Sequence, residues 1–225
     1  MVISEELIND MHVKLREHGW FYMSSVGPEK LFTLVSSLGR VIHETDIVID
    51  PERRGLLTSW KFLDFHTDHS MADYIAWICV KPAKEGGETI LMDARKAFSL
   101  LHSDDQKILA TIMLKEHRIF KNDPSQFPLV SNKNGNLKFY YSFWLATENM
   151  SDSQKRVFNA FRRAVAVTPF HQLKLYSNDI LIVDNSCIFH GRRAIMDPTR
   201  QLKRFWINST CNIAGGNHAH TSSRY

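Results

Sequence analysis

A histidine and an aspartate lie two positions apart near residue 67, where their side chains could bind one metal ion together. In an extended segment, residues i and i+2 point to the same side, so the imidazole of His66 and the carboxylate of Asp68 can reach the same ion. A site needs a third ligand, and His190 is the best candidate elsewhere in the chain. Two histidines and one carboxylate on one face of a metal, with the other positions open, form the ligand set of non-haem Fe(II) oxygenases.

Simpler interpretations of the same residues remain open. His66 and Asp68 could lie in a surface turn, with Asp68 as a local cap. His190 could be a core histidine that bonds a carbonyl group. His69 adjoins the pair, but its side chain should face away from that of Asp68, so we expect it to be structural or to support the ligands.

Length and composition indicate one soluble globular domain over residues 1–225. A chain of this length can bury a full core and enclose a pocket. Its hydrophobic content of 44% and charged content of 23% are ordinary for such a protein. The formal net charge of +4 is mild. It gives no reason to expect nucleic acid as a partner, whereas a small anionic substrate would be favoured.

The sequence also predicts a cytoplasmic protein without a membrane partner. The three cysteines lack the spacing of metal ligands, and Cys79 and Cys187 lie in apolar runs that are typical of reduced core cysteines. The N-terminus shows no basic region followed by an apolar stretch. No apolar run approaches the roughly 18 residues that a membrane span needs.

The spacing of apolar residues predicts the elements that would position the ligands. Helices are expected at 4–18, 28–38, 94–101, 103–116 and 151–165, and strands at 20–23, 74–80, 88–93, 137–145, 171–176, 180–184 and 204–210. Ser103 and Ser151 each precede a glutamine by three positions, the pattern of a capping box. Residues 40–62 and 121–136 are expected to be loops, and the tail 215–225 to be frayed. Several short strands with helices around them favour a β-barrel or jelly roll flanked by helices.

Five segments, taken together, resemble the taurine dioxygenase-like (TauD/TfdA-type) family of Fe(II)/2-oxoglutarate-dependent oxygenases. They are Phe65 to Asp68, Tyr74 to Val80, Pro82 to Asp93, Asp179 to Arg192, and Arg200 to Trp206. Their order and spacing match, and they cover about residues 60–210. The resemblance implies an α+β fold with a double-stranded β-helix (jelly-roll) core. It also implies oxidative decarboxylation of 2-oxoglutarate by O₂, coupled to oxidation of a second substrate.

This sequence departs from the family pattern in two respects. The chain is short for the family, which implies trimmed loops over the pocket. Asn178 stands where members often have glycine, although asparagine tolerates the left-handed turn that such a position requires.

The resemblance implies that His66, Asp68 and His190 hold the Fe(II). The carboxylate of Asp68 also bears on the reaction type. Related halogenases have a small residue at this position, which leaves a coordination position for chloride. A carboxylate here therefore favours hydroxylation.

The resemblance further assigns residues to the cosubstrate and the substrate. Thr89 and Arg200 should bind the distal carboxylate of 2-oxoglutarate, because a guanidinium grips a carboxylate with two donors. Arg204, four positions further along a strand, should face the same side and bind an anionic group of the substrate; the alternative is that the two arginines exchange roles and Arg204 binds 2-oxoglutarate. Either arginine could instead form a surface ion pair of little energetic value. Arg192 and Arg193 are expected to be loop or ion-pair residues.

These expectations lead to hydroxylation of an aliphatic C–H bond in a small molecule with an anionic group. A free amino acid is the first candidate, and a basic one in particular. Four acidic residues could accept its amino group: Asp64, Asp73, Glu116 and Asp123. The alternatives are the same chemistry on a sulfonate, an aryloxy acid or another small carboxylate, a zinc hydrolase with the same ligands, and a non-catalytic jelly-roll binding module.

Overall fold

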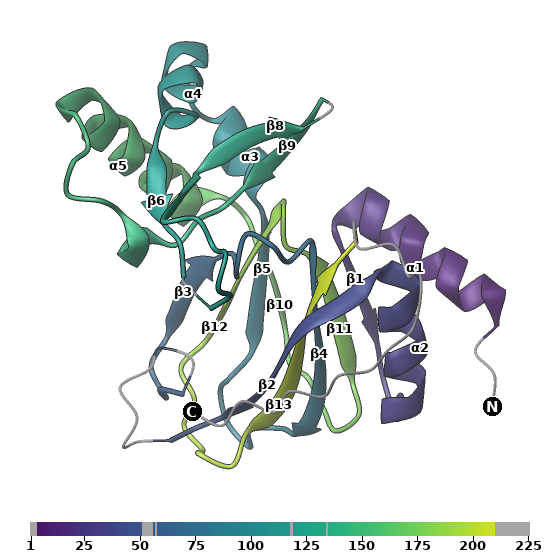
Figure 1. The fold of residues 1–225 in the computed structure, drawn as a ribbon. Helices are drawn as coiled ribbons and strands as arrows, with labels where there is room; N and C mark the ends of the chain where they lie inside the picture. The colour runs from purple at the N-terminus through teal and green to yellow at the C-terminus, as the bar shows by residue number, and fades with distance from the viewer. Residues whose placement is uncertain (1–3, 51–55, 57, 118, 134, 210–225) are drawn as a thin grey trace.

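The computed structural model describes residues 4–50, 56, 58–117, 119–133 and 135–209 (Figure 1). Its helices are α1 (Glu5–His18), α2 (Pro28–Leu38), α3 (Ala94–Ser99), α4 (Ser103–Leu109), α5 (Asp152–Val167) and the short 3-10 helix η1 (Phe143–Leu145). Its strands are β1 (Trp20–Met23), β2 (Arg40–Val48), β3 (Leu63–His66), β4 (Tyr74–Lys81), β5 (Thr89–Asp93), β6 (Met113–Lys115), β7 (Gln126–Pro128), β8 (Val130–Lys133), β9 (Asn136–Phe139), β10 (His171–Leu173), β11 (Ile180–Asp184), β12 (Ile188–Arg192) and β13 (Gln201–Asn208).

Two antiparallel sheets form the core of the molecule. One has the strand order β1-β11-β4-β13-β2 and the other the order β10-β5-β12-β3. Neighbours in each sheet come from distant parts of the sequence, so the chain passes between the sheets several times. β6-β7 and β8-β9 are separate two-stranded ribbons. The predicted α+β jelly roll with flanking helices is confirmed (Figure 1).

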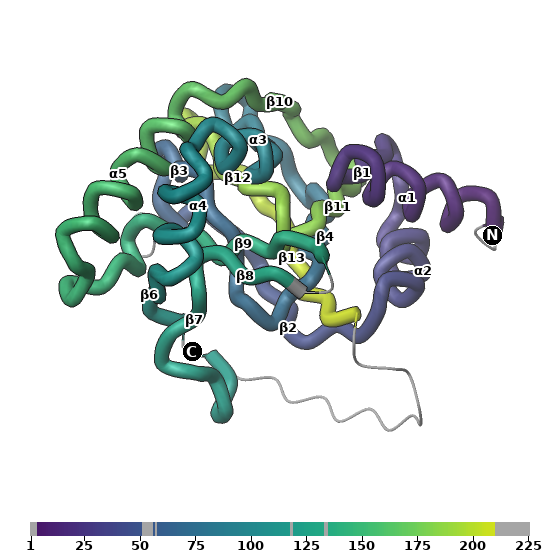
Figure 2. Tube along the Cα trace, turned by 90° about the horizontal axis from the view of Figure 1, so that it is seen from above, coloured from purple at the N-terminus to yellow at the C-terminus, as the bar shows by residue number. Residues whose placement is uncertain are grey.

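Successive side chains of a strand point to opposite faces of its sheet, so one set faces the helices and the other set faces the second sheet. In β11, Ile180 and Ile182 pack with α1 and α2, whereas Leu181 and Val183 pack with residues between the sheets. A third apolar cluster, which includes Phe161 of α5, joins α3, α4 and α5 to the second sheet. Figure 2 shows α1 and α2 on one side of the strands and α4 and α5 on the opposite side.

The ends of several helices follow from local sequence. Ser4 caps α1, and Gly19 ends it with a left-handed φ of 78°. Ser151 caps α5 in a complete capping box with Gln154. Asn178 adopts the left-handed φ of 68° that its turn requires.

Five sequence-based expectations about the elements are wrong. Residues 40–62 are not all loop, because Arg40–Val48 forms β2 along the edge of β13. The helix expected at 103–116 ends at Leu109, and the chain continues into β6, which pairs with β7. Ser103 is not a cap, because the N-cap of α4 is His102, without a side-chain bond. The expected loop 121–136 contains β7 and β8, and the strand expected at 137–145 stops at Phe139.

The segment 188–192 is a strand that the spacing of apolar residues did not predict. β12 is buried along its whole length and lies between β5 and β3 in the second sheet. The expected tail 215–225 and residues 51–55 lie outside the described residues. Within the described part of the chain, no helix combines the length and the apolar character that crossing a membrane requires.

Candidate metal centre

Two neighbouring strands bring the two predicted histidine ligands together. His66 ends β3 and His190 lies in β12, directly opposite it in the antiparallel register. Their ring centroids are 4.5 Å apart. Gly191 allows this approach, because a Cβ atom there would lie 2.5 Å from the carbonyl oxygen of Leu63. The close contact between β3 and β12 therefore positions the pair.

Asp68 joins the histidines from the turn that follows β3. Its backbone N–H donates to the Asn185 side chain over 2.8 Å, which ties this turn to the one between β11 and β12. The Asp68 Oδ1 atom lies 3.8 Å from Nε2 of His66 and 3.7 Å from Nε2 of His190. All three residues are buried, and one donor atom from each lies within 4.8 Å of the others. The structure thus brings the three residues into one cluster.

The protonation of these groups suits a metal ion. His66 donates Nδ1–H to the carbonyl oxygen of Asp64 over 2.8 Å, which leaves the lone pair of Nε2 facing the cluster. Burial, with the nearby His190, lowers the pKa of His66 to about 3, so the ring is neutral. Burial alone would raise the pKa of Asp68, but the Arg204 charge and His190 hold it below its usual range. Buried lone pairs that converge in this way repel one another unless a cation lies between them.

The second oxygen of Asp68 is held by β13. Arg204 Nη1 donates to Asp68 Oδ2 over 2.9 Å, and Trp206 Nε1 donates to the same atom over 2.8 Å. Oδ1 is therefore the atom turned toward the two imidazoles. Arg204 orients a candidate ligand, a role that the sequence did not predict. Its Nε atom has no partner among the described residues.

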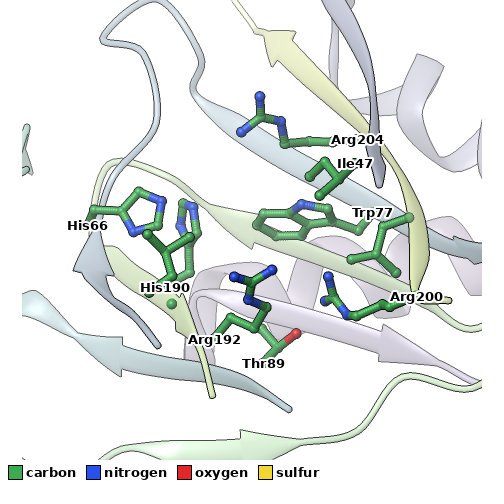
Figure 3. A pocket seen from close by; sticks show the side chains of 11 residues that line it. Ile47, His66, Trp77, Thr89, His190, Arg192, Arg200 and Arg204 are labelled. Carbon is green, nitrogen blue, oxygen red and sulfur yellow. The ribbon is translucent and has the colours of Figure 1, made fainter. Parts of the chain in front are cut away.

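A pocket adjoins the two histidines (Figure 3). It holds about 450 Å³ of empty space, open solvent included. Its polar lining comes from His66, His190, Thr89, Arg192, Arg200 and Arg204, and its apolar lining from Ile47, Leu63, Trp77 and Leu202. The predicted cosubstrate residues thus share one pocket beside the predicted metal ligands.

The pocket contains buried positive charge without a matching carboxylate. Arg192 and Arg200 are both buried, and neither forms an ion pair within the described part of the chain. Burial lowers the pKa of each to about 10, which leaves both groups charged at neutral pH. A cavity of this kind favours a small anion.

Arg192 is the charged pocket residue that the sequence analysis did not assign to the site. It had been expected in a loop or an ion pair, but it is the last residue of β12. A signal was present, because Arg192 follows His190 by two positions and a strand places both on one face. This spacing is informative only in a strand, and the apolar pattern of 188–192 does not predict one.

The predicted neighbours of the site mostly have partners of their own. His69 accepts from the N–H of Met71 at Nδ1, so its Nε2–H donates to Asp123 over 2.9 Å, in the structural role expected for it. Asp73 accepts from Lys138 and Ser209. Glu116 accepts from Tyr140, although its Oε2 has no partner among the described residues. Asp64 accepts from the backbone of Phe65. Asp73 and Asp123 are thus occupied and do not suit a substrate amino group.

Comparison with known proteins gives one family and several related structures. The model of the family "Taurine catabolism dioxygenase TauD, TfdA family" matches residues 23–206. Asparagine oxygenase in complex with Fe(II), 2S,3S-3-hydroxyasparagine and succinate is similar, with a TM-score of 0.75 and 16% identity over 92% of this chain and 80% of that one. No curated protein matches this sequence.

A second similar structure is the non-heme iron oxygenase OrfP. A mutant in complex with (3S)-hydroxy-L-Arg has a TM-score of 0.72 and 20% identity over 92% of this chain and 80% of that one. OrfP in complex with Fe and alpha-ketoglutaric acid has the same TM-score and 19% identity over the same shares. At these identities the likeness establishes a common fold.

Proposed function

Because the chain belongs to the TauD/TfdA family and is an Fe(II)/2-oxoglutarate-dependent dioxygenase, we propose that it hydroxylates an aliphatic C–H bond of a free amino acid. One observation carries the metal and cosubstrate part of this proposal. Three buried side chains of metal-binding type converge at the edge of a pocket in which Arg192 and Arg200 have no carboxylate partner among the described residues. A metal ion would satisfy the three side chains, and a small anion bound beside it would satisfy the two arginines.

In this proposal His66, Asp68 and His190 hold the Fe(II). Three protein ligands leave positions open for small molecules, as in other facial-triad enzymes. When bound, iron and 2-oxoglutarate supply the O₂ chemistry that oxidises an unactivated C–H bond and yields succinate and CO₂. The chain contributes ligand orientation: the Asp64 carbonyl fixes the His66 ring, and Arg204 with Trp206 fixes the Asp68 carboxylate.

Thr89 and Arg200 would bind the distal carboxylate of 2-oxoglutarate. Thr89 begins β5 and Arg200 immediately precedes β13, and both side chains line the pocket. A guanidinium binds a carboxylate through two parallel N–H donors, and a hydroxyl adds a third. The apolar side chains of Leu63 and Trp77 also line this pocket.

The choice of a free amino acid as substrate rests on the relatives and on Arg204. The asparagine oxygenase structure holds a hydroxylated asparagine, and the OrfP structure a hydroxylated arginine. Arg204 lines the pocket, and its Nε atom, which has no partner among the described residues, could bind a substrate carboxylate while Nη1 stays on Asp68. A basic amino acid such as lysine or arginine remains the first candidate.

The test is a panel of single-substrate reactions. Each contains the protein, Fe(II), ascorbate, 2-oxoglutarate and one amino acid, sulfonate or aryloxy acid, and mass spectrometry detects a gain of 16 Da. We expect a product from an amino acid and none from the Asp68→Ala variant. A product from a sulfonate or aryloxy acid, with none from any amino acid, would contradict the proposed substrate and leave the enzyme class intact.

A further inference from the structure

Arg192 combines two features that a purely structural arginine does not need. Its side chain is buried in the pocket wall, and its Nη2 atom donates to the carbonyl oxygens of Ser59 and Lys61, the second over 3.0 Å. Nε and Nη1 are also buried, yet they have no partner among the described residues. Buried N–H groups of a charged side chain are costly when unpaired. Two donor positions are thus left for a ligand.

The neighbours of Arg192 are the residues already assigned to the cosubstrate. In the pairing of β12 with β5, Arg192 lies directly opposite Thr89. Side chains opposite each other in such a pair stand on the same face of the sheet. The guanidinium groups of Arg192 and Arg200 also repel each other. Burial is the main cause of the lowered pKa of Arg200, and the charge of Arg192 is the second cause. Figure 3 shows both guanidinium groups directed into the pocket near Thr89.

We propose that Arg192 is a second cationic residue of the cosubstrate site and couples that site to the segment 58–62. Either Nε or Nη1, whose N–H bonds point in different directions, binds an oxygen of the distal carboxylate of 2-oxoglutarate beside Arg200 and Thr89, while Nη2 holds the main chain at Ser59 and Lys61. One carboxylate between two guanidiniums removes the repulsion between them. The proposal depends on the 2-oxoglutarate assignment and not on the amino-acid substrate.

We expect the segment 58–62 to respond to the cosubstrate, because residues at the end of β12 and just after it bind its main chain. Arg192 binds the carbonyl groups of Ser59 and Lys61, and the carbonyl of Trp60 between them accepts from the N–H of Ile195 over 2.7 Å. A carboxylate that fixes the Arg192 guanidinium also fixes its bonds to this segment. Binding of 2-oxoglutarate should therefore slow amide hydrogen exchange there.

The experiment measures two quantities on the Fe(II)-loaded protein without O₂. Calorimetry gives the Kd for 2-oxoglutarate, and hydrogen exchange with mass spectrometry gives protection of the peptide that contains 58–62. The variants are Arg192→Met, Arg192→Lys and, as a matched control, Arg193→Met. Arg193 is the next residue in the chain, but it is exposed, lies over the Phe62 and Phe170 rings, and donates to Gln172.

We expect Arg192→Met to raise the Kd roughly tenfold to a hundredfold and to abolish the protection caused by 2-oxoglutarate. Arg192→Lys should retain part of the affinity, because it keeps the charge but lacks the forked donors. Arg193→Met should behave like the wild type. An unchanged Kd in Arg192→Met would overturn the cosubstrate role. If Arg192→Met does not fold, hydrogen exchange of the wild type still tests the coupling. Equal exchange of 58–62 with and without 2-oxoglutarate would overturn it.

Discussion

The two oxygens of Asp68 have different surroundings, and this difference determines how the residue can act. Oδ1 faces two imidazole nitrogens, whereas Oδ2 accepts from Arg204 and Trp206. Because both donors belong to β13, the orientation of this carboxylate depends on a strand that carries none of the three proposed ligands. Partners of metal ligands in such positions tune affinity as well as geometry.

Replacement of Arg204 should therefore weaken metal binding. Arg204→Met leaves Oδ2 with the Trp206 donor alone, and we expect the affinity for Fe(II) to fall about 10- to 100-fold. Anaerobic titration with Fe(II) measures this loss. Lys203→Met is the control, because Lys203 is the preceding residue of β13 but pairs with Glu44 at the surface. Unchanged Fe(II) affinity in Arg204→Met would show that Arg204 serves the substrate alone.

The candidate ligands could be predicted from the sequence, but part of their surroundings could not. The spacing of His66 and Asp68 is a local property of the sequence, and His190 lies in a segment that resembles the family. The bond from Arg204 to Asp68 depends on the register between β13 and β4, which no local pattern encodes. The same limit concealed Arg192, whose inward direction requires knowing that 188–192 is a strand.

At the scale of elements, prediction failed where burial is one-sided or where apolar residues continue past a boundary. β2 has Arg40, Glu44 and Asp46 exposed on an edge strand, so its apolar periodicity is weak. α4 ends at Leu109, but the buried Ile112 and Leu114 continue the apolar series into β6. The pairing of β2 with β13 and of β6 with β7 determines that these segments are strands. Such tertiary pairing overrides local propensity.

The two predicted capping boxes should differ in energetic value. Ser151 bonds the N–H of Gln154, whereas Ser103 lies inside α4 and caps nothing. Ser151→Ala should therefore lower the free energy of unfolding by about 1 kcal/mol, and Ser103→Ala should change it by less than about 0.5 kcal/mol. Urea denaturation of both variants gives the comparison. Equal losses would mean that the assigned N-terminus of α4 is wrong.

Gly191 should be required for the contact between β3 and β12. Gly191→Ala places a methyl group against the Leu63 carbonyl, so the two strands must separate, at a cost of about 1–3 kcal/mol. Because His66 and His190 lie on these strands, Fe(II) affinity should fall as well. Gly27→Ala is the control, since no atom lies within 4 Å of its added Cβ. Thermal unfolding and Fe(II) titration would refute this requirement if both variants matched the wild type.

At the scale of the whole molecule, Asp73 links segments that are distant in sequence. It accepts from Lys138 of β9 over 2.8 Å and from Ser209, which follows β13. Burial alone would raise the pKa of Asp73, but the hydrogen bonds from Lys138 and Ser209 lower it below its usual range. A carboxyl group with a lowered folded-state pKa stabilises the protein above its unfolded pKa and loses this contribution as the pH falls.

Asp73→Asn should therefore destabilise the protein at pH 7 by about 1 kcal/mol, after allowance for solvent screening. The difference from the wild type should shrink as the pH falls below the ordinary value of 3.8 toward the lowered folded pKa. Urea denaturation at pH 7 and at pH 3 measures it. A difference that stays constant between these pH values would argue against an ionised Asp73 as the stabilising group.

The most direct test of the proposed metal centre is the absorption spectrum of the protein with Fe(II) and 2-oxoglutarate in the absence of O₂. Chelation of Fe(II) by 2-oxoglutarate gives a visible metal-to-ligand charge-transfer band. We predict this band in the wild type and in His171→Ala, whose histidine is exposed on β10, and its loss in His190→Ala with the far-ultraviolet circular dichroism unchanged. The same band in His190→Ala as in the wild type would contradict the proposed ligand set.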